Sequence, residues 1–299
     1  MCYNGNIENK GNGTIMKFWK KFGVLAMGAA VLCLSLLGTG CGDKPVICKE
    51  VVKCKSQLDA LTQLKAGTVD AAIIDSVMAK HYVAQSEYST LQIIDGLILK
   101  EEEYGIAGRK EDKAFLSEIN KALIAIANSD YQTIATKYHL QDDRTLTAAT
   151  TDPLAGATDD SWEEIKTSGK IIIGYTVFAP IAWPDGDVLT GFDVELARAV
   201  VAYLNEQYSL SLTLDFQEIS WDSKEALLSA GTVDLIWNGL TITDERKAEM
   251  CISVPYLKNN QVAVISKEDK DVYTDEASLK ETVIGVEGGS AGEDVVYGK

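Results

Sequence analysis

The sequence Ala-Gly-Thr-Val-Asp occurs twice in this chain, at residues 66–70 and again at residues 230–234. Each copy follows a short amphipathic run and precedes an apolar run that ends on polar residues, 71–74 before Asp75 and 235–237 in the second copy. This pattern predicts a helix, a tight turn and a buried strand with polar groups at its carboxyl end. Ligands bind at that end of open α/β sheets. The repeat therefore predicts two similar α/β lobes, each presenting a strand end to a shared ligand.

Length and composition narrow the possible functions. The 299 residues are enough for two ordinary domains. The 44 acidic and 28 basic residues give a formal net charge of −16, which argues against a nucleic-acid partner. Only His81 and His139 are available as imidazole ligands, so we expect no metal site of that kind. We also expect no cofactor.

Residues 16–41 have the features of a targeting segment. A basic start at Met16 leads into the apolar run 23–37, which is too short to span a bilayer comfortably. Small residues then lead to Cys41, and the segment resembles a bacterial lipoprotein signal in which that cysteine is acylated. Gly38 stands where such signals usually have Leu, so ordinary secretory cleavage is the alternative. Residues 1–15 would be an upstream extension or follow from a misassigned start.

Three cysteines follow Cys41 in the sequence, namely Cys48, Cys54 and Cys251. Cys48 and Cys54 are predicted to lie on one strand, where six residues separate them by about 20 Å. That separation is too large for a disulfide. We therefore expect buried, unpaired thiols.

Strands and helices are predicted to alternate along the chain, which favours parallel sheets. Residues 141–160 have linker composition without an apolar period, and 178–187 form a loop with two prolines. The predicted strands are 46–52, 71–74, 91–94, 104–108, 171–174, 212–216, 235–237, 261–265 and 283–286. The predicted helices are 56–65, 76–84, 112–128, 131–140, one from Ser161, 194–204, one after Trp221, one after Thr243 and a brief one ending at Tyr297.

From residue 44 onward the chain resembles the extracellular solute-binding proteins of amino-acid ABC importers. The second half of the chain resembles the N-terminal part of proteins of that family. The motifs that carry this resemblance are Gly-Phe-Asp-Val-Glu-Leu-Ala (191–197) and Gly-Leu-Thr-Ile-Thr-Asp-Glu-Arg (239–246). The first half resembles its end, in 64–75 and 102–107. The resemblance implies a type II periplasmic-binding-protein-like α/β fold, with two lobes of mostly parallel sheet joined by a two-strand hinge.

The order of these segments implies a circular permutation. Lobe two would combine residues 44–103 and 266–299, and lobe one would be residues 104–265, bridged by the linker 141–160. Termini that meet in space tolerate permutation well. A fused remnant of two truncated gene copies and a misassembled sequence are the alternatives.

Arg246 is the sharpest candidate binding residue. Thr243 is predicted to cap a helix that has Arg246 in its first turn, where a cation opposes the helix dipole. A surface arginine paired with Asp244 is the alternative. The resemblance implies that Arg246 binds the α-carboxylate of an amino acid, and a guanidinium suits bidentate pairing with a carboxylate.

Asp75 is the complementary acid. At its strand end it could pair with the α-ammonium of the ligand, or cap the helix that begins at Ser76. Thr241 and the backbone around Asn238 and Gly239 are predicted to hydrogen-bond the charged ends of the ligand, or else to form a turn.

Four aromatic residues are candidates for the pocket. The resemblance implies that Phe178 packs on the ligand side chain. Trp183 and Trp221 are further pocket candidates, with a core or rim position as the alternative. Trp237 would line the side-chain pocket together with Asn238 and Glu287, or lie in the core.

Residues 288–292 read Gly-Gly-Ser-Ala-Gly, which fits the nucleophile motif of hydrolases between a strand and a helix. No histidine follows Ser290, so catalysis is disfavoured. We expect instead that the backbone around Ser290 helps to hold the ligand carboxylate.

The sequence thus predicts a monomeric, non-enzymatic protein that closes on a free, polar amino acid and docks on ABC permease subunits. A lipid anchor at Cys41 would hold it on the outer side of the cell membrane. A dehydratase on the same fold, resembling cyclohexadienyl dehydratase, and a non-binding remnant are the alternatives.

Overall fold

The computed structural model describes residues 45–299, which form one compact unit. The predicted upstream extension, the signal segment and the lipidation site Cys41 lie outside the described residues. Within 45–299, none of the helices has the length and apolar character needed to cross a bilayer.

Helices and strands alternate as the sequence predicts. The α-helices of the described residues are α2 (Gln57–Lys65), α3 (Ser76–Val83), α4 (Lys113–Ala125), α5 (Asp130–Lys137), α6 (Ser161–Ser168), α7 (Phe192–Tyr208), α8 (Lys224–Ser229), α9 (Asp244–Glu249) and α10 (Ala291–Tyr297). Short 3-10 turns occur at Ser86–Tyr88, Gln141–Asp143, Trp221–Ser223, Lys267–Asp269 and Ala277–Leu279.

The strands that form the main sheet come from both halves of the chain. They are β1 (Glu50–Cys54), β2 (Ala71–Asp75), β3 (Leu91–Ile93), β4 (Lys100–Arg109), β5 (Lys170–Tyr175), β8 (Thr213–Glu218), β9 (Leu235–Thr241), β10 (Met250–Ile252), β11 (Leu257–Ser266) and β12 (Val283–Glu287). The order across the sheet is β1-β12-β2-β11-β4-β9-β5-β8, with β3 on β11 and β10 on β4. A separate hairpin pairs β6 (Trp183–Asp185) with β7 (Val188–Thr190).

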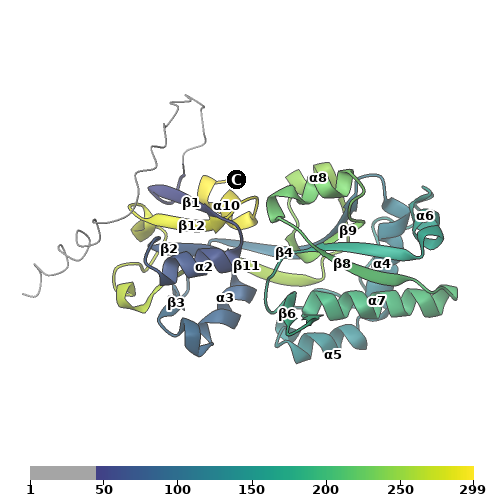
Figure 1. Ribbon diagram of the computed structural model, residues 1–299, viewed down its shortest axis with the longest axis horizontal. Helices are drawn as coiled ribbons and strands as arrows, with labels where there is room; N and C mark the ends of the chain where they lie inside the picture. The colour runs from purple at the N-terminus through teal and green to yellow at the C-terminus, as the bar shows by residue number, and fades with distance from the viewer. Residues whose placement is uncertain (1–44) are drawn as a thin grey trace, which may run out of the picture. The chain divides into compact units, whose positions relative to one another are not determined.

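The pairing is parallel toward both edges and antiparallel in the centre. β12 runs parallel to β1 and β2, and β5 runs parallel to β8 and β9. The long strands β4 and β11 pair antiparallel with each other through residues 100–104 and 257–261. They also pair antiparallel with their outer neighbours β9 and β2. Figure 1 shows β4 and β11 running between the two groups of parallel strands.

The two ends of the described chain lie together. The Val46 N–H donates to the carbonyl oxygen of Val296 at 2.9 Å, and β1 pairs with β12 over five residues from Glu50 and Val283. A Cβ atom added to Gly298 would lie 3.1 Å from a Val46 methyl group. Residues near 46 and near 298 are therefore direct neighbours.

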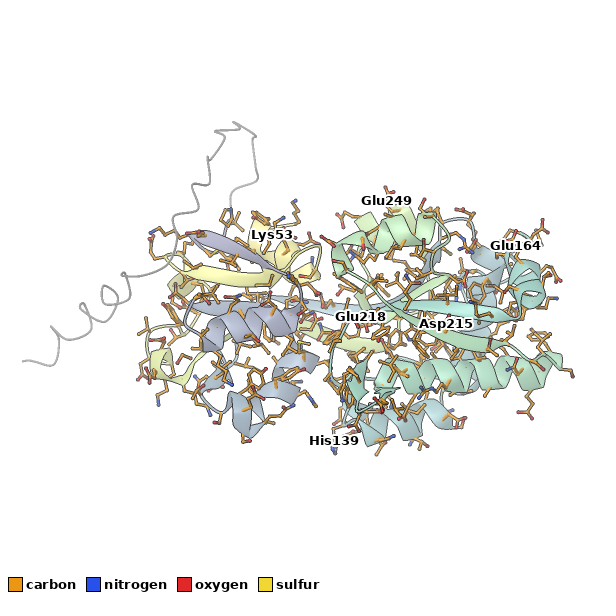
Figure 2. All side chains as sticks on the ribbon, viewed as in Figure 1. Lys53, His139, Glu164, Asp215, Glu218 and Glu249 are labelled. Atoms are coloured by element: carbon orange, nitrogen blue, oxygen red, sulfur yellow. The ribbon has the colours of Figure 1, made fainter. Side chains whose placement is uncertain are left out.

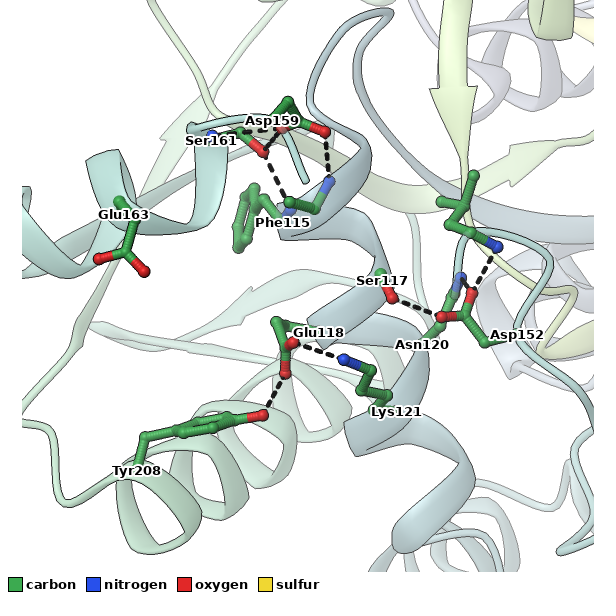
Figure 3. A network of polar contacts seen from close by, with 12 residues as sticks. Phe115, Ser117, Glu118, Asn120, Lys121, Asp152, Asp159, Ser161, Glu163 and Tyr208 are labelled. Atoms are coloured by element: carbon green, nitrogen blue, oxygen red, sulfur yellow. Dashed lines mark hydrogen bonds and ion pairs between the residues drawn. The ribbon is translucent and has the colours of Figure 1, made fainter. Parts of the chain in front are cut away.

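Residues 141–160 lack regular structure after the turn at Gln141–Asp143, but side chains fix them to the fold. The Asp152 carboxylate accepts from the hydroxyl of Ser117 at 2.5 Å and from the amide of Asn120 at 2.6 Å (Figure 3). The Thr145 hydroxyl donates to the carbonyl of Pro255 at 2.7 Å, and Leu146 is buried. The segment has the irregular backbone expected of a linker, yet it is packed along much of its length.

Three details differ from the prediction. Cys48 precedes β1, so it does not share a strand with Cys54, although both are buried and unpaired, as is Cys251. The predicted loop with two prolines, 178–187, includes β6 and the turn of the β6–β7 hairpin, where Gly186 has a φ of +61°. The short strand β10 was not predicted.

Candidate functional site

One pocket gathers most of the residues predicted to bind a ligand. Its lining residues are Gln57, Asp75, Thr176, Phe178, Trp221, Asn238, Gly239, Thr241, Arg246, Glu287, Ser290 and Ala291. The empty volume is about 270 Å³ when open solvent at the mouth is included, but only about 10 Å³ of it can hold the centre of a water-sized molecule. That volume holds roughly one water molecule. The pocket therefore has little free space between its walls.

Arg246 reaches the pocket from the first turn of α9. The Thr243 hydroxyl caps this helix by accepting from the Arg246 N–H at 3.1 Å, as predicted. The guanidinium is buried and donates to the carbonyl oxygens of Thr241 at 2.7 Å and Gly289 at 3.2 Å. Asp244 pairs with Lys247 instead, so the alternative of a surface ion pair is wrong. Within residues 45–299, no carboxylate lies within ion-pair distance of Arg246.

Asp75 is the last residue of β2 and is 3% exposed. Although it precedes α3, its side chain does not cap that helix. Its carboxylate accepts from the amides of Gln57 at 2.7 Å and Asn259 at 2.8 Å, and also from Gln261. Burial raises the pKa of this carboxyl, while the hydrogen bonds from the amides oppose the shift.

Glu102 lies behind Asp75 on β4 and is tied to the same amides. Its carboxylate accepts from Asn259 at 2.5 Å, Gln261 at 2.8 Å and the Thr241 hydroxyl at 3.0 Å. Burial, together with the charge of Asp75, raises the pKa of Glu102 to about 8. The Thr241 hydroxyl therefore belongs to the hydrogen-bond network of Glu102. Thr241 is the last residue of β9, so the alternative prediction that it forms a turn is wrong.

The backbone at Gly239 is shaped by two neighbours. Its φ is +64°, and an added Cβ would lie 2.8 Å from the ring of Phe178. Its N–H donates at 2.8 Å to the buried carboxylate of Asp193, so this donor points away from a ligand. The Asn238 side-chain amide lies 2.8 Å from the Thr176 hydroxyl, and both residues line the pocket.

Gly289 precedes the pocket residue Ser290 and contacts two cations. Its carbonyl oxygen accepts from Arg246 and, at 3.1 Å, from the ammonium of Lys224. Its N–H donates to Glu293 at 2.7 Å, and Glu293 pairs with Lys53 at 2.5 Å. Lys53 lies on β1 (Figure 2). Two cations, one from α8 and one from α9, therefore converge on one carbonyl of the loop that follows β12.

Lys224 is the second cation near the pocket, and the sequence did not single it out. It is 2% exposed, donates to the Trp221 carbonyl at 3.2 Å and pairs with Glu225 at 3.0 Å. Burial lowers the pKa of this ammonium group, and the charge of Arg246 lowers it further.

Glu287 is the third acid in this region and the last residue of β12. Its side chain is 4% exposed, and its Oε1 atom has no hydrogen-bond partner within residues 45–299. Burial raises the pKa of Glu287 to about 8, while the charges of Lys224 and Arg246 oppose the shift. Glu287 thus presents an unsatisfied carboxyl oxygen at the pocket.

The aromatic candidates separate into two groups. Phe178 and Trp221 line the pocket, whereas Trp183 does not. Trp183 packs against His81 and Tyr138 at ring distances of 6.0 and 5.9 Å, because the β6–β7 hairpin carries it away from the pocket. Trp237 is buried in the core and is also absent from the pocket lining.

The Ser290 hydroxyl caps α10 by accepting from the Glu293 N–H at 3.2 Å. Neither histidine lines the pocket around Ser290. The geometry therefore gives this hydroxyl a capping contact and no base for nucleophilic attack.

Sequence reasoning missed four polar residues that shape the site: Gln57, Glu102, Asn259 and Gln261. A signal for three of them is present, because side chains on a strand alternate between two faces. Glu102 shares a face of β4 with buried Tyr104, and Asn259 and Gln261 share a face of β11 with buried Leu257. Polar residues at inward positions of a strand therefore mark this network.

Comparison with known proteins gives partial matches. Residues 171–286 match the family described as bacterial extracellular solute-binding proteins, family 3. The arginine-binding extracellular protein ArtP of Bacillus subtilis (strain 168) is 31% identical over 42% of this chain and 46% of its own length. The L-cystine-binding protein TcyJ of Escherichia coli (strain K12) is 30% identical over 41% of this chain and 45% of its own.

A solved structure of an ABC uptake transporter substrate binding protein from Streptococcus pneumoniae with bound histidine is 36% identical. It covers 31% of this chain and 36% of its own, with a TM-score of 0.27. The chain thus matches less than half the length of each of these relatives. The two curated relatives are named as binding proteins, in agreement with the expectation that the chain is not an enzyme. Residues 171–286 are thus similar to the bacterial extracellular solute-binding proteins, family 3.

Proposed function

We propose that this protein is the substrate-binding component of an ABC uptake transporter and captures a free amino acid outside the cytoplasm. The observation that carries the proposal is that Arg246 and Asp75 line one pocket, although the sheet places β9 and β2 on opposite sides of β4 and β11. A buried guanidinium and a buried carboxyl in one small pocket suit a ligand that carries both an anionic and a cationic group.

Arg246 would bind the α-carboxylate. Its hydrogen bonds to carbonyl oxygens direct the guanidinium but leave its charge uncompensated. A ligand carboxylate would supply that compensation with charge-assisted hydrogen bonds.

Asp75 would bind the α-ammonium, with the amides of Gln57, Asn259 and Gln261 holding its carboxylate in place. Three amide donors stabilise the ionised form of this carboxyl, and an incoming ammonium would stabilise it further. The predicted contacts from Gly239 need revision, because its N–H is already taken by Asp193.

The closed pocket requires a movement that admits the ligand. We propose that residues 44–103 with 266–299 form one lobe, that residues 104–265 form the other, and that β4 and β11 are the hinge. Two long strands that connect two groups of parallel strands support this division. Opening would break the hydrogen bonds of Arg246 and Lys224 to Gly289.

The circular permutation remains part of the proposal. It is supported by the family match, which spans 171–286 as one segment near the end of the chain. The hydrogen bond between Val46 and Val296 supports it as well, since a permuted chain needs its former neighbours in contact.

The partners follow from this function. A transporter component of this kind would deliver its ligand to permease subunits in the membrane, as a monomer. Acylation of Cys41 would anchor the protein to the extracytoplasmic face of the cell membrane. Secretion after ordinary signal cleavage is the alternative.

A thermal-shift screen of the twenty amino acids and cystine tests the proposal, followed by calorimetry on the hits. A ligand at a hundred times its Kd stabilises the folded state by about 2.7 kcal/mol. We expect amino acids with one kind of side chain to raise the melting temperature of the protein, and the others to leave it unchanged. A flat response to all of them would reject the proposal.

A further inference from the structure

The charges in the pocket do not cancel, and this imbalance concerns the side chain of the ligand. The charged residues of its lining are Asp75, Glu287 and Arg246, whose ionised forms sum to one negative charge. Next to the pocket, the ammonium of Lys224 is compensated by its ion pair with Glu225 at 3.0 Å. A zwitterion adds no net charge, so binding its α-groups to Arg246 and Asp75 leaves Glu287 without a charged partner, although Gln57 hydrogen-bonds its carboxyl.

Among the charged residues that line the pocket, Glu287 is the one with an unsatisfied oxygen within residues 45–299. It is 4% exposed, and its Oε1 atom accepts no hydrogen bond within residues 45–299. A buried carboxyl oxygen without a donor is costly, because it has lost its water without gaining a partner. The nearby cations do not supply one, since Lys224 pairs with Glu225 and Arg246 with carbonyl oxygens.

The remaining walls suit an elongated cationic side chain. Phe178 and Trp221 line the same pocket as Glu287. Aromatic faces attract ammonium and guanidinium groups while packing against their methylene stems. Lys224 already occupies one side of Trp221, with its ammonium 5.0 Å from the ring centroid.

We propose that the ligand is a basic amino acid and that Glu287 selects it by receiving the positively charged side chain. This inference rests on the proposed function, because it assumes that Arg246 and Asp75 bind the α-groups. The ligand would bring one positive charge, so the pocket would become neutral overall. Glu287 is then a specificity-determining residue.

Arginine and citrulline provide the decisive pair of probes, because they share a shape and differ in charge. Lysine and norleucine form a second pair, and glutamine and glutamate complete the panel. We expect calorimetry at pH 7 to show at least about tenfold tighter binding of arginine than of citrulline, since a desolvated charge pair contributes strongly. Lysine is expected to bind more tightly than norleucine for the same reason.

The variant Glu287→Gln keeps the shape of the side chain and removes its charge. We expect it to weaken arginine binding by about tenfold or more while changing citrulline binding little. Glu218→Gln is the matched control, because Glu218 is an exposed glutamate at the end of β8 and lies outside the pocket lining (Figure 2). Circular dichroism melts of both variants establish that each one is folded.

The outcomes separate the two proposals. Tighter binding of citrulline, glutamine or glutamate than of arginine, with loss of that binding in Arg246→Ala, would overturn the selection by Glu287 and leave the proposed function standing. Equal losses of arginine and citrulline binding in Glu287→Gln would also overturn it. A folded protein that binds no amino acid would overturn both proposals.

Discussion

Asp75 and Glu102 share the same two side-chain amides. Asn259 donates to Asp75 at 2.8 Å and to Glu102 at 2.5 Å, and Gln261 donates to both carboxyls. Two buried carboxyls this close resist being charged at the same time, because like charges repel strongly in a poorly solvated site. The pKa of Glu102 is accordingly raised to about 8, which makes the network sensitive to pH.

This sensitivity predicts that the ligand-free protein loses stability as the pH rises from about 4.5 to about 8. An unfolded glutamate releases its proton near pH 4.3, whereas folded Glu102 holds it to about pH 8. Across that window the folded state binds the extra proton, so deprotonation favours unfolding. Glu287, with its pKa near 8, and Asp193, with its pKa near 7, act in the same direction.

Urea unfolding at several pH values measures this slope. Glu102→Gln mimics the protonated side chain, so it should flatten the slope by up to about 1.4 kcal/mol per pH unit within the window. Identical slopes for the variant and the parent protein would contradict a protonated Glu102.

Arg246→Ala should lose about a hundredfold or more in ligand affinity. The substitution removes the cation expected to bind the α-carboxylate and leaves that ligand group buried without a partner. Lys247→Ala is the control, because Lys247 is exposed on the same helix and pairs only with Asp244. Calorimetry with the best ligand of the screen compares them. Unchanged affinity in Arg246→Ala would remove Arg246 from the site.

Gly289→Ala should lower the affinity for the ligand beyond the effect of the stability that it loses as a left-handed alanine. Gly289 has a φ of +71°, and an added Cβ would lie 3.2 Å from the Cα of Asp222. Gly67→Ala is a matched control, because Gly67 has a φ of +72° and open space around its Cβ position.

Both alanine variants carry the cost of a left-handed residue, about 1–2 kcal/mol. Only Gly289→Ala should also hinder closure, so we expect its affinity for the ligand to fall by several fold more than that of Gly67→Ala. Equal affinities in the two variants would show that the contact with Asp222 does not limit closure.

A rearranged chain tests the permutation. It would begin at Ala157, run to Lys299, continue through a short glycine linker to Pro45 and end at Gly156. Val46 already contacts Val296, so the linker should impose little strain, and Gly156 is exposed. We expect the rearranged protein to fold and to bind the same ligand with similar affinity, by circular dichroism and calorimetry. Failure to fold would mean that the continuous segment 141–160 is essential.

Much of this architecture could be predicted from the sequence, because the responsible signals are local. Apolar runs after the two Ala-Gly-Thr-Val-Asp turns gave β2 and β9, and the position of Arg246 after a capping threonine was confirmed by the contact with Thr243. Most of the predicted binding residues line one pocket, although their role in binding a ligand stays a prediction.

The remainder depends on which strands pair, and pairing is not a local property. Glu102, Asn259 and Gln261 lie on β4 and β11, and only the antiparallel register of these strands brings their polar side chains beside Asp75. Trp183 was misplaced for a similar reason, because the β6–β7 hairpin directs it toward His81 and Tyr138.

The order of strands across the sheet has a consequence for how this chain is made. In the part of the sheet ordered β1-β12-β2-β11-β4-β9, strands from the first half of the chain alternate with strands from the second half. β1, β2 and β4 precede residue 141, and β12, β11 and β9 follow residue 160. On the ribosome, β1, β2 and β4 therefore emerge with none of their eventual partners yet synthesised. The nascent first half should need shielding by chaperones until the second half arrives, and two separately expressed halves should complement each other as a split reporter.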